Sequence, residues 1–289
     1  MLKFAVVGNK GLFGSEVFNL LESSGINVIG FNRSNLKFEE LDASQLARIL
    51  DGFDVVINAV GYTAVDEAET NLEKAFFANA TIPQLLAVAT SKVGSRLLHI
   101  STDYVFDGSG TRPYQTHDPV APQTAYGRSK ALGEQLVFEA SSNSIVVRTA
   151  WLYGRRGACF PKMVANRLAL KSPLFVVDDQ VGQPTWTRDL AEQTIQLATR
   201  GVGQRLIHSV SSGYCTWAEF AEEVADYLGY DSKKVIERID SSSYPSIAKR
   251  PSWSVLDNTN NGLIPIGDWR SRWRYAASDT LETASGFTR

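Results

Sequence analysis

Short apolar runs rich in valine and isoleucine alternate with amphipathic stretches through the first half of this 289-residue chain. The apolar runs lie at residues 2–7, 27–31, 54–60, 96–101 and 144–149. The amphipathic stretches predict helices at residues 13–23, 43–50, 71–92 and 125–140. Strands that alternate with helices of this length predict a parallel sheet, and right-handed crossovers place the helices on both of its faces. We therefore predict an α/β fold with a doubly wound parallel sheet.

The pattern becomes less regular after about residue 154. Helices are predicted near residues 161–170 and 187–199, and Thr216 stands where it would cap a third helix. We expect residues 1–154 to form one domain that carries the catalytic residues. Residues 155–289 would form mainly a smaller, interrupted C-terminal lobe that binds substrate, with some segments returning to the first domain.

Composition and charge exclude several classes of protein. The formal net charge of −2, from 29 basic and 31 acidic residues, gives no broad attraction to nucleic acid or to an anionic membrane. Only Cys159 and Cys215 are present, without Cys or His at metal-site spacing, which argues against a disulfide framework or structural zinc. No apolar run reaches about 18 residues, and residues 1–9 lack a signal-peptide pattern. We expect a soluble cytoplasmic protein and leave a homodimer open.

Three glycines follow the first apolar run and open the first predicted helix with the spacing G-x-x-G-x-x-G. Glycine permits close approach of a ligand to the backbone, and the N–H groups of a helix N-terminus attract a pyrophosphate. A tight turn that binds nothing is the alternative. The spacing resembles that of the extended branch of the short-chain dehydrogenase/reductase superfamily, which implies a Rossmann-like, dinucleotide-binding domain. The expected cofactor contacts here are Gly8, Lys10, Gly11, Leu12, Phe13 and Gly14.

The residues after the second strand bear on the choice of cofactor. An NAD site usually places an acid on the adenosine ribose, whereas an NADP site accommodates a 2′-phosphate with arginine. Here the segment is Asn32-Arg33-Ser34, and Arg33 can form a charge-assisted contact, with Lys10 as a second cation. The alternative for Arg33 is a solvated loop residue. NADPH is favoured, and NADH is left open.

Two further segments are expected beside the cofactor. Asp42 precedes a helix that begins at Ala43 and would cap it. In the superfamily that the chain resembles, the matching acid also lies beside the adenine. Ala59, Val60 and Gly61 end the third strand, and this segment resembles the one that runs along the cofactor.

Tyr126 and Lys130 form the candidate catalytic pair. They are four residues apart on a predicted helix, so their side chains share one face. A nearby cation stabilises phenolate and would lower the pKa of Tyr126 from its ordinary value of ~10. We expect Tyr126 to donate a proton to a substrate carbonyl while hydride arrives from a nicotinamide, and Lys130 also to reach the nicotinamide ribose. Thr102, at the end of a strand, is placed to hydrogen-bond the same carbonyl oxygen.

The same spacing occurs a second time, at Tyr230 and Lys234. This pair flanks a turn in the less regular half of the chain, so we interpret it as structural. The corresponding alternative for Tyr126 and Lys130 is an ordinary pair on a helix surface. The order of strand, glycine loop and helix favours the catalytic interpretation for the first pair.

Seven ordered motifs carry a resemblance to a known family. They are GNKGLFG at 8–14, NAVGYTAVDEAE at 58–69, STDYVFDG at 101–108, AYGRSK at 125–130, RTAWLYG at 148–154, DDQVGQPT at 178–185 and RPSWSVLD at 250–257. The chain resembles the dTDP-4-dehydrorhamnose reductase family. The resemblance implies NADPH-dependent reduction of the C4 ketone of a dTDP-4-keto-6-deoxyhexose, with dTDP-4-dehydrorhamnose converted to dTDP-L-rhamnose. It also implies that the C-terminal lobe binds the nucleotide sugar.

The resemblance implies a set of substrate contacts. A dTDP-sugar needs a local cation for its diphosphate and a flat apolar platform for its sugar, and Arg250 and Trp151 meet these needs. The alternative for Trp151 is a core aromatic. Some relatives use magnesium at a dimer contact, but no carboxylate cluster can be mapped here, so no metal is assigned. The expected substrate contacts are Thr102, Asp103, Tyr126, Trp151, Gln183, Thr185 and Arg250.

Three other functions compete with this interpretation. A sugar dehydratase or epimerase of the same branch would keep its cofactor bound, but a dehydratase normally has glutamate where Tyr104 follows Asp103. A 4-ketoreductase for another dTDP-deoxysugar would use identical catalytic residues. A non-catalytic NADP-binding regulatory subunit is the third, and the presence of Thr102, Tyr126 and Lys130 argues against it.

Overall fold

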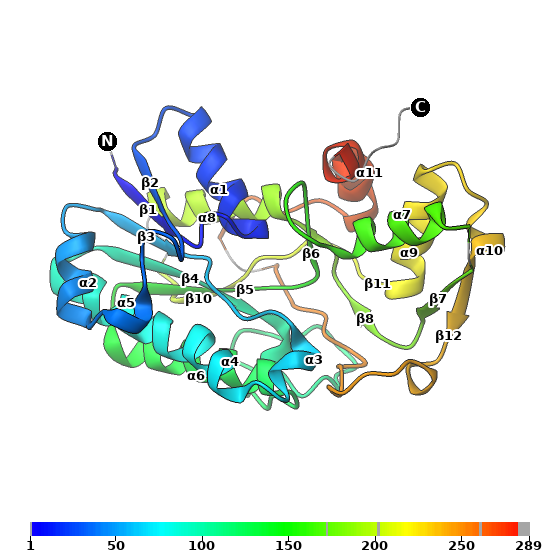
Figure 1. Ribbon diagram of the computed structural model, residues 1–289, viewed down its shortest axis with the longest axis horizontal. Coiled ribbons are helices and arrows are strands. Elements are labelled where there is room, and N and C mark those ends of the chain that lie inside the picture. Colours follow the sequence, from blue (N-terminus) through cyan, green and yellow to red (C-terminus); the bar gives the residue numbers. More distant parts are fainter. Residues whose placement is uncertain (1, 172, 201–202, 260–261, 283–289) are drawn as a thin grey trace.

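The computed structural model describes residues 2–171, 173–200, 203–259 and 262–282, and it contains a six-stranded sheet (Figure 1). The strand order is β10-β5-β4-β3-β1-β2, and every neighbouring pair is parallel. The strands are β1 (Phe4–Val7), β2 (Val28–Phe31), β3 (Val55–Asn58), β4 (Arg96–Thr102), β5 (Ser144–Thr149) and β10 (Leu206–His208). The predicted doubly wound parallel sheet is confirmed. Strand β10 was not predicted.

Helices cover both faces of this sheet (Figure 1). One face carries α1 (Leu12–Ser23) and α8 (Thr187–Arg200), and the other carries α2 (Ala43–Leu50), α5 (Ile82–Val93) and α6 (Ala125–Ala140). Alternate residues of β1 belong to different cores, Val6 with α1 and Val7 with α2. Burial on both faces explains why the strands are continuous apolar runs in the sequence.

The helix predicted at residues 71–92 is interrupted. It consists of α4 (Leu72–Phe76), a π-helical turn (Phe77–Thr81) and α5. The π-helical turn carries Asn79, which is buried and accepts a hydrogen bond from the Tyr62 N–H (2.8 Å). Its amide also donates to the Ser129 hydroxyl on α6 (2.9 Å). Wide turns of this kind occur often at functional sites, and this one connects the end of β3 with α6.

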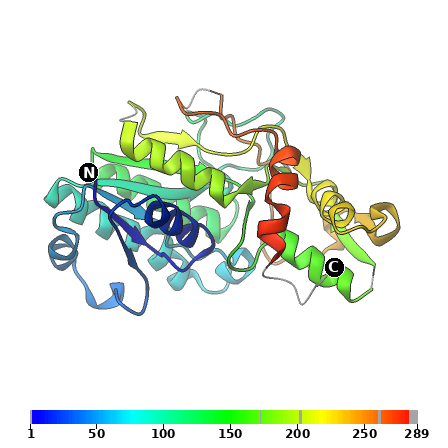
Figure 2. The same cartoon turned by 90° about the horizontal axis from the view of Figure 1, so that it is seen from above.

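The C-terminal lobe packs its own core around Trp273, Phe220 and Tyr153. Its helices are α7 (Phe160–Ala169), α9 (Trp217–Tyr227), α10 (Ser232–Val235) and α11 (Trp269–Leu281). Its paired strands are β6 (Leu152–Tyr153) with β9 (Thr185–Trp186), β7 (Leu174–Val177) with β12 (Ile236–Ile239), and β8 (Val181–Gly182) with β11 (Cys215–Thr216). Figure 2 shows α11 beside α7, at the side of the lobe that meets the sheet. Helix α8 packs on the main sheet and β10 is an edge strand of it, although both follow residue 154 in the sequence.

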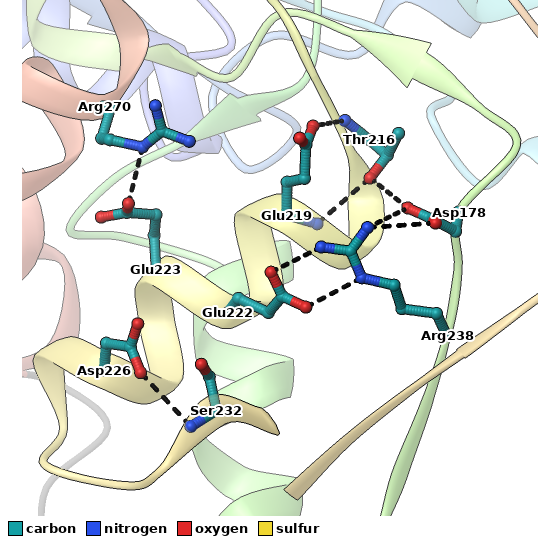
Figure 3. A network of polar contacts seen from close by, with 9 residues as sticks. All are labelled: Asp178, Thr216, Glu219, Glu222, Glu223, Asp226, Ser232, Arg238 and Arg270. Carbon is teal, nitrogen blue, oxygen red and sulfur yellow. Dashed lines mark hydrogen bonds and ion pairs between the residues drawn. The ribbon is translucent and has the colours of Figure 1, made fainter. Parts of the chain in front are cut away.

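A polar network joins the elements of this lobe (Figure 3). Thr216 caps α9 as predicted: its hydroxyl accepts from the Glu219 N–H, and the Glu219 carboxylate accepts from the Thr216 N–H. Arg238 on β12 pairs with Asp178 after β7 (3.1 Å) and with Glu222 on α9 (2.7 Å). One guanidinium therefore connects β7, β12 and α9.

A buried ion pair lies beneath the carboxyl ends of β4 and β5. Arg148 on β5 donates to both carboxylate oxygens of Glu134 on α6, at 2.9 and 2.6 Å. The two side chains are only 3% and 5% exposed. Ser101 on β4 donates to the same carboxylate at 2.5 Å. This network ties α6 to the two strands next to it.

Removing one partner of this pair should destabilise the fold strongly. Arg148→Met leaves the Glu134 carboxylate buried without its counter-charge, and we expect a loss of about 3–5 kcal/mol in the free energy of unfolding. Urea unfolding measures the loss. Arg112→Gln, which breaks the exposed pair with Asp118, serves as control and should stay close to the unmodified protein. Equal, small losses in both variants would contradict the prediction.

Candidate active site

The glycine loop between β1 and α1 forms a cradle that side chains would fill. A Cβ atom on Gly14 would lie 2.2 Å from the Gly8 carbonyl oxygen, and one on Gly8 would lie 2.9 Å from the Ala59 carbonyl carbon. Gly8 also has a φ of +91°, which favours glycine. Gly11 is the N-cap of α1, no side chain caps this helix, and its first turn has no acid. Its N–H groups therefore fit the pyrophosphate of a dinucleotide.

The loop after β2 presents positive charge next to this cradle. Arg33 and Lys10 are exposed, and neither forms an ion pair or hydrogen bond with another residue that the structure describes. Asn32 orders the loop, because its side chain donates to Asn9 (3.1 Å) and accepts from the Ser34 N–H (3.0 Å). The loop after β2 and the glycine loop therefore each present one exposed cation.

Asp42 and the end of β3 are the other two places where cofactor contacts were predicted. Asp42 accepts hydrogen bonds from the Ser44 and Gln45 N–H groups, both at 2.8 Å, so its predicted cap on the helix that starts at Ala43 is confirmed. After β3, the Val60 N–H donates to the side chain of Asn58 (3.0 Å). This bond shapes the turn that includes Gly61. The Cβ distances to Ala59 show that this turn packs on the glycine loop.

The structure brings Thr102, Tyr126 and Lys130 together. Thr102 ends β4, and Tyr126 and Lys130 lie in the first turns of α6, whose N-terminus Thr124 caps. A Cβ on Gly127 would lie 2.2 Å from the Tyr104 carbonyl oxygen, so α6 begins in close contact with the segment after Thr102.

Burial sets the charge states of this cluster. It raises the pKa of the Tyr126 phenol, with the Thr102 hydroxyl opposing the rise. It lowers the pKa of Lys130 to about 8, with the Glu134 carboxylate opposing the fall. The Lys130 ammonium donates to the Ile100 carbonyl at 2.5 Å. The predicted lowering of the Tyr126 pKa by Lys130 is therefore wrong for this arrangement. At neutral pH Tyr126 is a protonated phenol, which is the form that donates a proton.

Asp103 follows directly, in a 3₁₀ turn (Asp103–Val105). Thr102 donates to its carboxylate at 2.9 Å. Burial raises the pKa of Asp103 to about 6, and hydrogen bonds from the Ser254 and Thr102 hydroxyls limit the rise. The group titrates close to neutral pH next to the phenol, so it can accept or donate a hydrogen bond there.

Trp151 has a strained backbone and a stacked partner. Its φ is +45°, which is rare for a bulky residue. The indole lies flat on that of Trp217, with ring centroids 3.4 Å apart and planes 4° apart. Gly182 closes against the ring, because a Cβ there would lie 2.3 Å from Trp151 Cε2. Strain that surrounding contacts maintain is typical of ligand sites. Sequence reasoning missed Trp217, although it directly follows the predicted cap Thr216.

A pocket of about 710 Å³ lies beside Trp217, the stacking partner of Trp151. This volume is in the range of small-molecule sites, roughly 300–1,000 Å³. Trp217 and Arg250 line it, together with Phe160 and Tyr244. Thr102 and Tyr126 do not line it, but Asp107, five residues after Thr102, and Gln123, three residues before Tyr126, do.

Gln183 and Thr185 are placed differently from the prediction that they line the cleft. Both are buried, and neither lines the pocket. The Gln183 amide donates to the carbonyls of Ser211 (3.1 Å) and Leu256 (3.2 Å) and accepts from the Leu256 N–H. The Thr185 hydroxyl donates to the Gln183 carbonyl (3.1 Å). These side chains hold three chain segments together behind the site.

Within residues 2–171, 173–200, 203–259 and 262–282, no group of three or more His, Cys, Asp or Glu side chains could hold a metal ion. The helices in these ranges include none with the length and apolarity needed to span a bilayer.

The sheet, the glycine cradle and the Thr-Tyr-Lys cluster define a Rossmann-type reductase that uses a nicotinamide dinucleotide. Residues 2–285 match the family model of the RmlD substrate binding domain, and the chain belongs to this family.

Named relatives and a solved structure agree with this family. The chain is 39% identical to the dTDP-4-dehydrorhamnose reductase of Mycobacterium tuberculosis strain H37Rv, over 93% of this chain and 90% of the relative. It is 37% identical to a probable dTDP-4,6-dihydroxy-2-methyloxan-3-one 4-ketoreductase of Streptomyces antibioticus, over 97% and 96%. The crystal structure of the Bacillus anthracis dTDP-4-dehydrorhamnose reductase in complex with NADP superposes with a TM-score of 0.89 at 29% identity, over 97% and 100%.

The contact between Gly182 and Trp151 can be tested directly. In Gly182→Ala the new methyl group should displace the Trp151 indole from Trp217, because it would lie 2.3 Å from the ring. We expect a clear change in the near-ultraviolet circular dichroism that the stacked pair produces. Gly203→Ala is the control, since a Cβ there meets nothing within 4 Å. A spectrum like that of the control would contradict the stacking argument.

Proposed function

We propose that this protein uses NADPH to reduce the C4 ketone of a dTDP-4-keto-6-deoxyhexose, converting dTDP-4-dehydrorhamnose to dTDP-L-rhamnose. The observation that carries the proposal is the meeting of Thr102, a protonated Tyr126 and Lys130 at the end of β4. The glycine cradle at the start of α1 and the pocket lined by Trp217 and Arg250 also support the proposal. The names of the relatives support the choice of sugar nucleotide.

The cofactor, when bound, supplies the hydride that reaches C4 of the sugar. The N–H groups at the start of α1 would hold its pyrophosphate, and Gly8, Gly11 and Gly14 leave room for it. Arg33 and Lys10 would pair with the 2′-phosphate, which is the reason to prefer NADPH over NADH. Asp42 would keep the adenine side of the site in place through its cap on α2.

Tyr126 would donate its proton to the O4 oxygen while the hydride arrives at C4. The Thr102 hydroxyl would hydrogen-bond the same oxygen and orient the ketone. Lys130 would hold the ribose hydroxyls of the cofactor from its position at the Ile100 carbonyl. The Trp151 indole would pack against the sugar, and Arg250 would pair with the diphosphate.

Turnover with defined sugar nucleotides tests this function. The purified protein is mixed with dTDP-4-keto-6-deoxyhexose isomers and NADPH or NADH, NADPH loss is followed by absorbance, and the product stereochemistry is determined. We expect oxidation of NADPH in preference to NADH, with dTDP-L-rhamnose as product. A different product isomer would favour a 4-ketoreductase of another dTDP-deoxysugar, which the Streptomyces antibioticus relative supports. Binding of NADPH without turnover of any isomer would favour a regulatory subunit.

Removal of the phenolic hydroxyl tests the proton donor. Tyr126→Phe should lower turnover by about 100-fold or more, because hydride transfer then builds an alkoxide with no proton donor beside it. Binding of NADPH, measured by calorimetry, should be unchanged. Tyr230→Phe is the matched control, because Tyr230 and Lys234 repeat the same spacing. Near-normal turnover of Tyr126→Phe would exclude the assigned role.

A further inference from the structure

Asp66 gathers hydrogen bonds from a segment about 180 residues away. We call residues 244–252 the strap. The Asp66 carboxylate accepts from the Ser246 hydroxyl (2.8 Å), from the N–H groups of Ile247 (3.1 Å) and Ala248 (3.0 Å), and from the Arg250 guanidinium (2.6 Å). Burial raises the pKa of Asp66, but the bonds from Ala248, Ser246 and Arg250 outweigh it and hold the pKa below its ordinary value. The carboxylate is therefore ionised at neutral pH.

The strap forms one wall of the pocket described above. Just before it, Ser241 is bonded to Asp179, and at its end Ser252 donates to the Gly108 carbonyl (2.9 Å). Over residues 246–250, every hydrogen bond to another segment of the described chain ends on Asp66, except the contact of Arg250 with Tyr104. Asp66 is thus the attachment point in the middle of the wall.

Helix α3 (Val65–Ala68) carries Asp66, and the residue after it contacts α6, the helix of Tyr126 and Lys130. The Glu69 carboxylate, one residue after α3, accepts from the Ala125 N–H at the start of α6 (2.8 Å) and pairs with Arg128 (3.6 Å). Ala125 directly precedes Tyr126. In Figure 1, α3 lies against the orange part of the chain that contains the strap. The strap is therefore held at a set distance from Tyr126 through α3.

Arg250 also connects Asp66 with Tyr126, through Tyr104. The Arg250 guanidinium lies beside Tyr104, whose pKa burial raises to about 12 while Arg250 opposes the rise. The Tyr104 ring packs edge-on against Tyr126, with centroids 5.5 Å apart. The ion pair with Asp66 thus orients a cation that touches both the pocket and a neighbour of Tyr126.

We propose that Asp66 is a positioning residue that holds the strap and Arg250 in place, so that the nucleotide-sugar pocket is formed before the substrate binds. This inference rests on the proposed function. A wall that is already ordered does not have to be ordered on binding, so its attachment contributes to substrate affinity. Asp66 does not touch the reacting carbonyl in this arrangement, so the proton transfer itself does not require it.

Asp66→Asn tests the inference, because the amide oxygen still accepts from the strap N–H groups while the negative charge opposite Arg250 is lost. We expect the KM for the sugar nucleotide and the Kd for dTDP, from calorimetry, to rise about tenfold or more. The kcat should stay within about threefold, and the Kd for NADPH should not change. Asp118→Asn is the matched control, since Asp118 also accepts from an arginine and a backbone N–H but lies outside the strap. It should leave all four constants unchanged.

A double-mutant cycle separates a positioning role from general loss of structure. If Asp66 acts through Arg250, then Asp66→Asn added to Arg250→Met should raise the KM little beyond Arg250→Met alone. Fully additive effects, an unchanged dTDP affinity in Asp66→Asn, or a fall in kcat at constant KM would each overturn the inference. Calorimetry with dTDP does not depend on turnover. If no sugar nucleotide is reduced by the unmodified protein, the proposed function fails while the role of Asp66 is still measured.

Discussion

The buried ion pair between Arg148 and Glu134 positions the catalytic residues, because it joins the helix and the two strands that carry or flank them. Glu134 lies on the same face of α6 as Tyr126 and Lys130, one turn further along. Ser101, which bonds the same carboxylate, directly precedes Thr102. A shift of α6 against β4 would break a pair that has no water to replace it. The separation of Tyr126 and Thr102 is therefore set by the core and does not depend on a flexible loop.

Sequence patterns correctly predicted the features that depend on residues close together in the chain. Continuous apolar runs indicate strands buried on both faces, and five of the six strands of the main sheet lie where these runs are. The caps at Asp42 and Thr216 follow from side chains that bond N–H groups two or three residues away. The glycine spacing predicted the part of the cradle in which Gly14 closes against the Gly8 carbonyl of the same loop. In each case the cause lies within one or two elements of the chain.

The features that sequence reasoning missed depend on partners that are distant in the chain. Gln183 was expected in the cleft, but its amide is used by carbonyls 28 and 73 residues away. Trp151 stacks on Trp217, and no periodicity connects the two. The spacing of Tyr126 and Lys130 showed correctly that they share a helix face. It could not show that burial raises the pKa of Tyr126, or that the Ile100 carbonyl on β4 accepts a hydrogen bond from the Lys130 ammonium.

The main sheet and the C-terminal half of the chain contribute different groups to the proposed reaction. Reduction of a ketone at C4 needs the same donor, orienting hydroxyl and cation whichever deoxysugar is bound, and these groups are held by the core of the main sheet. Most residues that line the pocket, among them those of β7 and the strap, belong to the less regular half of the chain. Because Asp66 attaches the strap to α3, the walls can vary in sequence and still remain at one distance from Tyr126. The role proposed for Asp66 would therefore allow selection among dTDP sugars to change without any change in the groups proposed to transfer the proton.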